Sequence, residues 1–213
     1  MEDQAPEHVC VVEDEPKVRA VLRKTLERAG FTVNCFASAD DCLAYLDSGK
    51  CDVLVTDVRM PEKDGIELLA EVKKTLPWLP ALVVTGFGDV PMAVKAFKMG
   101  AADFIEKPLD RDTFLAAVRT LLARNPARKV LSERTLTRME LKVLYQILEG
   151  KNNREIADAL SRSHRTVEVH RRHLMRKLKA NNVVELLQQA AKLHLSKPDA
   201  SAAAARDATG ERE

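Results

Sequence analysis

The sequence predicts an α/β domain with a doubly wound, five-stranded parallel (βα)5 sheet, followed by an all-α domain of four helices. Three observations lead to this fold class. Up to Arg124, short apolar runs alternate with segments of helical period, which is typical of repeated β–α units. Beyond Arg124 the helical period continues without any strand signal. The charge also changes, because residues 1–125 carry 16 Lys+Arg and 21 Asp+Glu, whereas residues 126–213 carry 18 and 11. Such a split favours an acidic domain joined to one that binds a polyanion.

Five strands are expected in the α/β part. Each is a run of four or five residues, mostly apolar or β-branched, as buried strands require. The expected strands are His8–Val12, Thr32–Phe36, Val53–Thr56, Ala81–Thr85 and Asp103–Glu106.

Helices are expected between and after these strands. The first begins at Pro16, because proline suits the first helical position, and ends at Gly30, a typical C-cap residue. Its apolar face is expected to carry Val18, Val21, Leu22, Leu26 and Ala29. The other helices of this part are expected near residues 39–47, 65–75, 90–99 and 111–122.

The remaining segments divide into a linker, a helical domain and a tail. The first domain is assigned to residues 7–124, and residues 125–135 form a short basic linker that contains a proline. Residues 136–195 form the helical domain, with helices expected at 138–148, 153–160, 165–179 and 183–193. The polar, small-residue-rich stretch 197–213 is expected to be disordered.

Composition excludes some classes of protein. No apolar run is long enough to span a bilayer, and the acidic start Met1–Glu7 lacks the form of a signal peptide. We therefore expect a soluble cytoplasmic protein with no membrane partner. The four cysteines contain no C-x-x-C pair, so they are interpreted as small apolar side chains.

Charged and hydroxyl residues follow several of the expected strands. In a parallel α/β sheet, the carboxyl ends of the strands meet at one edge, where ligands bind. The residues expected at this edge are Glu13, Asp14, Asp57, Thr85 and Lys107. Carboxylates this close repel one another unless a cation joins them, and oxygen ligands suit Mg²⁺ or Mn²⁺. The sequence therefore predicts a divalent metal site.

These residue types also suggest a chemistry. An aspartate can attack phosphorus to form an acyl phosphate, while Lys107 and the Thr85 hydroxyl bind the phosphoryl oxygens. Any one of these residues alone would be an ordinary surface residue at a strand end. Phe104 is open to two interpretations, as a core aromatic or as a residue that also reports the state of the site.

The segments "VVEDE", "VTDVRMPEKDG" and "VTGFGDVPMAVKAFKMGAADFIEKP" resemble the receiver domain of two-component response regulators. The resemblance implies that Asp57 is the phosphoacceptor for a sensor histidine kinase. It also implies that Asp14, Asp57 and the Arg59 main-chain carbonyl bind the metal, with Glu13 acting through water. Thr85 and Phe104 would form the switch that moves on phosphorylation.

The second part contains a basic helix-turn-helix pattern. "NREIADAL" and "HRTVEVHRRHLMRKLK" read as two helices separated by "SRS", with Ser163 as the N-cap of the second. Val167, Leu174 and Leu178 are expected to pack inward, with Arg171 between them. The opposite face carries Arg165, Glu168, Val169, Arg172 and Arg176. A basic helix is often only a solvated face, but an apolar Val169 among charges favours contact with a thymine methyl group.

The segment from Leu136 to Leu186 resembles the LuxR-type helix-turn-helix of NarL/FixJ-family regulators. The resemblance implies base contacts and phosphate contacts to double-stranded promoter DNA from the second helix, and a dimer contact from the last helix. Arg162 departs from the family's usual aliphatic residue, and it either loosens local packing or adds a phosphate contact. The implied base contacts are Glu168, Val169 and Arg172, and the implied phosphate contacts are Thr166, His170, Arg171 and Lys177, beside Arg165 on the same exposed face.

These patterns together predict a response regulator, most similar to the FixJ subgroup, that acts as a transcription factor. Phosphorylation of Asp57 would pair two receivers, place a homodimer on an inverted-repeat site and engage RNA polymerase. One alternative is a receiver that acts as a phosphorylation-independent interaction domain. The other is a haloacid-dehalogenase-like phosphohydrolase, although Arg59 stands where such an enzyme needs its second aspartate.

Overall fold

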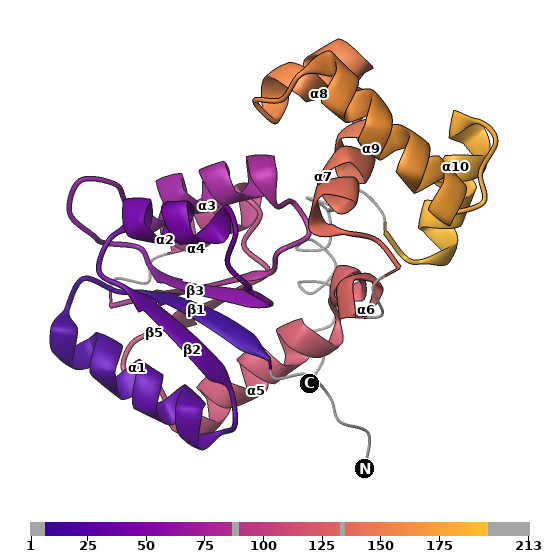
Figure 1. Cartoon of the computed structure of the whole chain (residues 1–213). Helices are drawn as coiled ribbons and strands as arrows, with labels where there is room; N and C mark the ends of the chain where they lie inside the picture. Colours follow the sequence, from indigo (N-terminus) through magenta and orange to yellow (C-terminus); the bar gives the residue numbers. More distant parts are fainter. Residues whose placement is uncertain (1–6, 87–89, 133–134, 196–213) are drawn as a thin grey trace, which may run out of the picture. The chain divides into compact units, whose positions relative to one another are not determined.

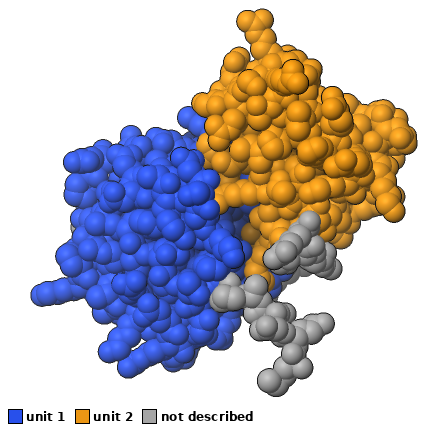
Figure 2. All heavy atoms as spheres, in the orientation of Figure 1, with its two compact units in different colours: residues 1–74, 78–124, 200–213 blue, residues 75–77, 125–199 orange. Residues whose placement is uncertain are grey.

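The structure, a computed structural model, describes residues 7–86, 90–132 and 135–195 (Figure 1). The chain divides into two compact units, and the boundary between the two domains falls between Arg124 and Asn125 (Figure 2). The tail 197–213, for which disorder is expected, lies outside the described residues.

The first unit contains a sheet of five parallel strands in the order β2-β1-β3-β4-β5. The predicted doubly wound fold is therefore confirmed. The order in which successive strands are added to the sheet reverses between β1 and β3. In such folds, ligands bind at this reversal point. The strands are β1 His8–Val12, β2 Thr32–Phe36, β3 Val53–Asp57, β4 Ala81–Thr85 and β5 Asp103–Glu106. Four match the expected bounds, and β3 is one residue longer because Asp57 continues the strand.

Helices cover both faces of this sheet, with α1 and α5 on one face and α2, α3 and α4 on the other (Figure 1). Apolar residues of β1, β2, β3 and β4 pack against Leu22 and Leu26 of α1 and against Phe114 and Val118 of α5. The helices are α1 Pro16–Arg28, α2 Ala39–Leu46, α3 Gly65–Thr75, α4 Val90–Lys98 and α5 Arg111–Ala123. All five begin at the expected residue and end within one or two residues of the expected end.

The buried face of α1 is narrower than expected. Leu22 and Leu26 are buried, but the Val21 side chain is 63% exposed, so its assignment to the core face was wrong. Adjacent helical residues are separated by about 100° around the axis, and the sheet covers only the stripe centred on Leu22 and Leu26. The expected end of the helix is confirmed, since Gly30 has φ +95°.

The four cysteines lie in the first unit and none forms a disulfide. Cys10 and Cys42 are fully buried, whereas Cys35 and Cys51 are half-buried. Burial raises the pKa of the Cys35, Cys42 and Cys51 thiols above their ordinary value. These three thiols are therefore protonated at neutral pH, which agrees with their interpretation as small apolar side chains.

The second unit is entirely helical over its described residues. Its first helix, α6, was not expected, because residues 125–135 were interpreted as a linker. Pro126 occupies its first position and Asn125 accepts a hydrogen bond from the Ala127 amide at 3.1 Å, so the segment begins as helices commonly do. Ala127 and Val130 are buried, which explains why the helix forms. The helices are α6 Pro126–Ser132, α7 Arg138–Leu148, α8 Asn153–Ala159, α9 His164–Lys177 and α10 Val183–Lys192.

Side-chain caps define the starts of the last four helices. Thr137 and Asn152 form capping boxes with Glu140 and Glu155, and Ser163 and Asn182 cap α9 and α10. The Ser163 cap confirms the prediction. Val167 and Leu174 of α9 and its C-cap residue Leu178 are buried, as expected, so this helix presents its opposite face outward. Among the described residues, no helix has the length and apolar character needed to cross a membrane.

Candidate functional site

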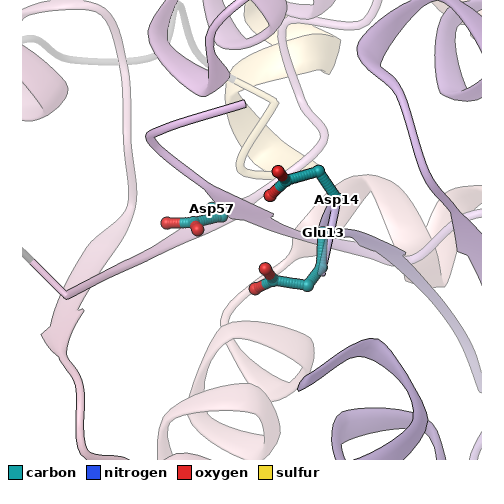
Figure 3. Close-up of side chains that lie close together, drawn as sticks. All are labelled: Glu13, Asp14 and Asp57. Atoms are coloured by element: carbon teal, nitrogen blue, oxygen red, sulfur yellow. The ribbon is translucent and has the colours of Figure 1, made fainter. Parts of the chain in front are cut away.

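Three carboxylates meet where β1 and β3 end (Figure 3). Glu13 and Asp14 follow β1 directly, and Asp57 is the last residue of β3. One oxygen from each carboxyl group lies within 4.8 Å of an oxygen of each of the others. Glu13 is 1% exposed and Asp57 is 9% exposed, while Asp14 is half-buried. The predicted cluster of acidic residues is thus brought together at the reversal point of the sheet.

Lys107 lies in the same pocket, although it is far from these residues in the sequence. Its Nζ is 2.8 Å from Glu13 Oε2 and 3.0 Å from Asp57 Oδ2. The Lys107 amide donates a hydrogen bond to the Thr85 carbonyl at 2.7 Å, which ties the segment after β5 to the end of β4. The Lys107–Pro108 peptide bond is cis.

Burial and charge have opposite effects on the pKa values of this pocket. Burial raises the pKa of Glu13 above its ordinary value, and the hydrogen bond and charge of Lys107 offset this only in part. Burial alone would lower the pKa of Lys107, but hydrogen bonds to Glu13 and Asp57 outweigh it and raise the pKa. Lys107 is therefore an ammonium ion at neutral pH, held between two carboxyl groups.

The backbone around Asp57 is closely packed. The Val58 amide donates to Asp57 Oδ1 at 2.7 Å, and the Thr56 hydroxyl donates to the Asp57 carbonyl at 2.9 Å. A Cβ atom on Gly65, the first residue of α3, would overlap this same carbonyl oxygen far inside van der Waals contact. The Gly65 amide also donates to the Val58 carbonyl at 2.9 Å. Glycine is therefore needed here so that α3 can begin against the end of β3.

The other residues expected in the pocket lie around it. Thr85 is buried at the end of β4, one residue beyond Val84, which pairs with Asp57 across the sheet. Phe104 is half-buried in β5, opposite Val83. The Arg59 side chain is exposed.

Arg19 was not predicted from the sequence. Its Nη1 donates to the Glu13 carbonyl at 2.6 Å and to the Asp14 carbonyl at 3.0 Å. A basic residue in the first turns of a helix gives no signal of this contact, because the contact depends on how the preceding loop folds back.

The donor set of the pocket fits a divalent cation. Three carboxyl groups face a single ammonium group, so the ionised pocket carries more negative than positive charge. Oxygen donors of this kind suit Mg²⁺ or Mn²⁺ rather than softer metals.

The exposed face of α9 carries most of the residues expected to contact DNA. Arg165, Glu168, Val169 and Arg172 are exposed, and Val169 exposes 38% of its surface. Arg162, just before this helix, is exposed as well, so it does not occupy a core position. Thr166 and His170 are half-buried on the edge of the same face.

Two of the expected phosphate-binding residues also have partners within the unit. Arg171 Nη1 donates to Asn153 Oδ1 of α8 at 2.7 Å. Lys177 Nζ is 2.7 Å from Glu140 Oε2 of α7. Glu140 is 3% exposed and was not predicted from the sequence, although its capping-box spacing after Thr137 could have identified it as a structural residue.

The family description "Response regulator receiver domain" matches residues 9–119, more than half of the chain. A second description, "Bacterial regulatory proteins, luxR family", matches residues 134–190. The chain belongs to the response regulator family. It is a receiver domain followed by a LuxR-type DNA-binding domain, as the sequence predicted.

Named relatives match this response regulator over most of its length. The transcriptional regulatory protein FixJ of Rhizobium meliloti is 40% identical over 193 residues, which cover 85% of this chain and 94% of that protein. The response regulator protein TodT of Pseudomonas putida is 33% identical over 189 residues, covering 84% and 83%. The crystal structure of full-length FixJ from B. japonicum has a TM-score of 0.55 and 36% identity, and covers 89% of this chain and 98% of that one.

The response regulator is therefore a two-component transcriptional regulator, and its domain pair implies a histidine kinase and DNA as partners.

Proposed function

We propose that the receiver domain accepts a phosphoryl group on Asp57 from a sensor histidine kinase and so controls DNA binding by the second domain. The observation that carries this proposal is the Asp57 carboxylate, held at the end of β3 with Lys107 Nζ at 3.0 Å and two further carboxyl groups beside it. The Asp57 carboxylate as nucleophile, the Lys107 ammonium group for the phosphoryl oxygens, and carboxyl groups of a kind that can bind a metal lie in one pocket.

In the proposed step, an Asp57 carboxylate oxygen attacks phosphorus and forms an acyl phosphate. The P–N bond of the phosphohistidine breaks, and its electron pair stays on the imidazole nitrogen. Lys107 moves its ammonium group from the carboxylates to a phosphoryl oxygen, and the Thr85 hydroxyl donates to another. Hydrolysis by water later returns Asp57 to the free carboxylate.

Asp14, Asp57 and the Arg59 main-chain carbonyl are proposed to bind Mg²⁺ or Mn²⁺, with Glu13 acting through water. When bound, the ion neutralises charge on the phosphoryl group during transfer. Before transfer, the 2.8 Å ion pair between Glu13 and Lys107 holds the other side of the pocket.

Dimerisation is the proposed output of phosphorylation. The apolar side chains of Val90, Val94 and Met99 expose 78%, 44% and 41% of their surface, on α4 and just after it. Movement of Thr85 and Phe104 would reshape this surface so that two receivers pair. On DNA, Val183, Val184 and Leu187 of α10 provide a second apolar contact.

A homodimer would place two α9 helices in successive major grooves of an inverted-repeat promoter site. Base contacts are assigned to Glu168, Val169 and Arg172, and the remaining contacts of this helix to phosphates. The bound dimer would then recruit RNA polymerase.

The Asp57→Asn variant tests the phosphoacceptor. It is expected to lose all phosphoryl transfer from acetyl phosphate, because an amide oxygen is a poor nucleophile, while its fold is unchanged. Intact-protein mass spectrometry measures the adduct. Asp47→Asn, an exposed change after α2, is the matched control and is expected to react like the wild type. A stable adduct on the Asp57→Asn variant would move the site elsewhere.

The receiver is not expected to act as a phosphohydrolase. The residue two positions after Asp57 is the exposed Arg59, which cannot serve as a general acid at neutral pH. Incubation with a small phosphate ester is expected to give no multiple turnovers. If DNA affinity stays the same when Asp57 is fully phosphorylated, the receiver is instead a phosphorylation-independent interaction domain.

A further inference from the structure

Arg19 connects the first helix to the main chain of the acidic pocket. It lies in the first turn of α1, and its Nη1 bonds both the Glu13 carbonyl (2.6 Å) and the Asp14 carbonyl (3.0 Å). One guanidinium group thus bridges the two consecutive residues whose carboxyl groups face Asp57.

The other hydrogen bonds of the short segment between β1 and α1 include a long one of 3.4 Å, from the Glu15 amide to Glu13 Oε1. Glu15, the N-cap residue of α1, makes no side-chain cap hydrogen bond, and Pro16 has no amide hydrogen to donate. The Glu13 amide bonds the Phe36 carbonyl at 3.1 Å, which fixes the start of the segment. The direction of the two carbonyls after it depends on Arg19, because hydrogen bonds from a charged donor are stronger than neutral ones.

The hydrogen bonds from Arg19 matter because the carboxyl groups of the pocket repel one another. The carboxyl groups of Glu13 and Asp14 lie within 4.8 Å of that of Asp57, and like charges at this distance repel. Lys107 contacts Glu13 and Asp57 at 3.0 Å or less. These ion pairs offset the repulsion between Glu13 and Asp57, so the repulsion that remains acts mainly on Asp14. It would rotate the Glu13–Asp14 segment away from β3 unless the main chain of that segment is held.

We infer that Arg19 is a positioning residue that holds the Glu13–Asp14 main chain so that both carboxyl groups face Asp57, and that it thereby sets the affinity of the pocket for a divalent cation. The inference rests on the proposed metal binding by this pocket. Arg19 itself touches neither the cation nor the phosphoryl group.

Arg23 provides a matched control. It lies one helical turn further along α1 and pairs with Glu27 at 3.1 Å, with 54% of its side chain exposed. Arg23→Met and Arg19→Met are the same substitution on the same helix, and each removes one positive charge and shortens the side chain equally. Only the Arg19 variant loses contact with the pocket.

The test measures the unfolding temperature of the full-length protein against MgCl₂ concentration. A ligand that binds only the folded protein raises this temperature according to its Kd. Arg19→Met is expected to weaken Mg²⁺ binding by about tenfold, the usual scale for residues that orient metal ligands. Arg23→Met is expected to bind like the wild type. Equal Mg²⁺ affinity in both variants overturns the inference.

A second measurement separates positioning from general destabilisation. With acetyl phosphate, Arg19→Met is expected to need about tenfold more Mg²⁺ for half-maximal phosphorylation yet to approach the wild-type rate at saturation. A rate that stays low at saturating Mg²⁺ contradicts positioning. Where Arg19→Met does not fold, Arg19→Lys keeps the charge but not the planar guanidinium, and a smaller loss of affinity is expected. A folded Arg19→Lys variant with wild-type affinity then overturns the inference.

The wild type and Asp57→Asn distinguish the two proposals. If Mg²⁺ does not stabilise the wild type, or stabilises Asp57→Asn equally, the proposed metal site fails. If Mg²⁺ stabilises the wild type and Arg19→Met equally, only the inference about Arg19 fails.

Discussion

At the residue scale, the position of Asp57 depends on a neighbour that has no side chain. Gly65 begins α3 where a Cβ atom would overlap the Asp57 carbonyl oxygen, which is backbone and cannot rotate away. Gly65 therefore does more than mark a turn in the sequence, because the close approach of α3 to Asp57 requires a residue without a Cβ atom.

The Gly65→Ala variant is expected to destabilise the first unit by about 2–3 kcal/mol, because the added methyl group forces the start of α3 away from β3. Urea unfolding measures this, and phosphorylation by acetyl phosphate should slow as well. Gly86→Ala is the control, since a Cβ atom there has open space and is expected to cost under about 0.5 kcal/mol. Equal stability of the two variants would contradict the packing argument.

Sequence reasoning missed Arg19, which acts through main-chain contacts, and Glu140, which pairs with Lys177. The acidic residues and Lys107 were found because each directly follows an apolar strand, and parallel strands end at one edge. Arg19 has no such signal, since its role depends on two carbonyl groups that fold back over α1. Charged side chains along a helix look alike in the sequence unless a spacing rule applies to them.

At the element scale, strands and helices were predicted nearly to the residue where turn and cap residues mark their ends. The α6 helix was missed because Pro126 was interpreted as a linker residue. Pro126 is the first residue of its helix, as Pro16 is of α1, and Asn125 before it accepts a hydrogen bond from the Ala127 amide. Val21 was misplaced because apolar spacing alone does not give the width of the buried stripe.

Glu140 joins two helices of the DNA-binding unit. It caps α7 through the Thr137 amide at 2.7 Å and pairs with Lys177 at the end of α9. Burial alone would raise its pKa, but the hydrogen bonds from Lys177 and Thr137 outweigh this and lower the pKa below its ordinary value of 4.5. The charged form of Glu140 therefore stabilises the folded unit.

The Glu140→Gln variant is expected to destabilise α7 and α9 by about 1–2 kcal/mol at pH 7. Glutamine retains the capping box but not the charge that holds Lys177. Because the folded pKa lies below the unfolded one, the wild-type advantage is present above about pH 4.5 and is lost as pH falls through the folded pKa. Amide hydrogen exchange in the full-length protein measures this at pH 7 and at lower pH.

Glu155→Gln is the matched control for that experiment. Glu155 occupies the same capping-box position in α8 but is exposed, so its loss is expected to cost under about 0.5 kcal/mol. Equal protection of α7 in the two variants would show that the ion pair contributes nothing.

At the scale of the whole molecule, the proposed pairing of receivers is the step that would carry phosphorylation to the DNA-binding unit. The Val94→Glu variant is expected to take up phosphate from acetyl phosphate normally but to remain monomeric, because it places a charge in the exposed apolar surface of α4. Its affinity for promoter DNA should fall by at least about tenfold relative to the phosphorylated wild type. Sedimentation velocity and gel shifts at one stated salt concentration measure both effects.

Val21→Glu is the control for the α4 surface. Val21 is 63% exposed on α1, which covers the opposite face of the sheet, so this variant is expected to dimerise like the wild type. Loss of dimerisation in both variants would indicate a general effect of added charge. Retained dimerisation of Val94→Glu would place the contact on another surface.

The distribution of cysteine gives the molecule a built-in reporter. All four thiols belong to the receiver and the DNA-binding domain has none, while the two innermost thiols are shielded from solvent. An alkylating reagent at mildly alkaline pH should therefore modify Cys10 and Cys42 only when the receiver opens. Counting added labels by mass would time that opening in the intact protein, with no engineered probe and no contribution from the other domain.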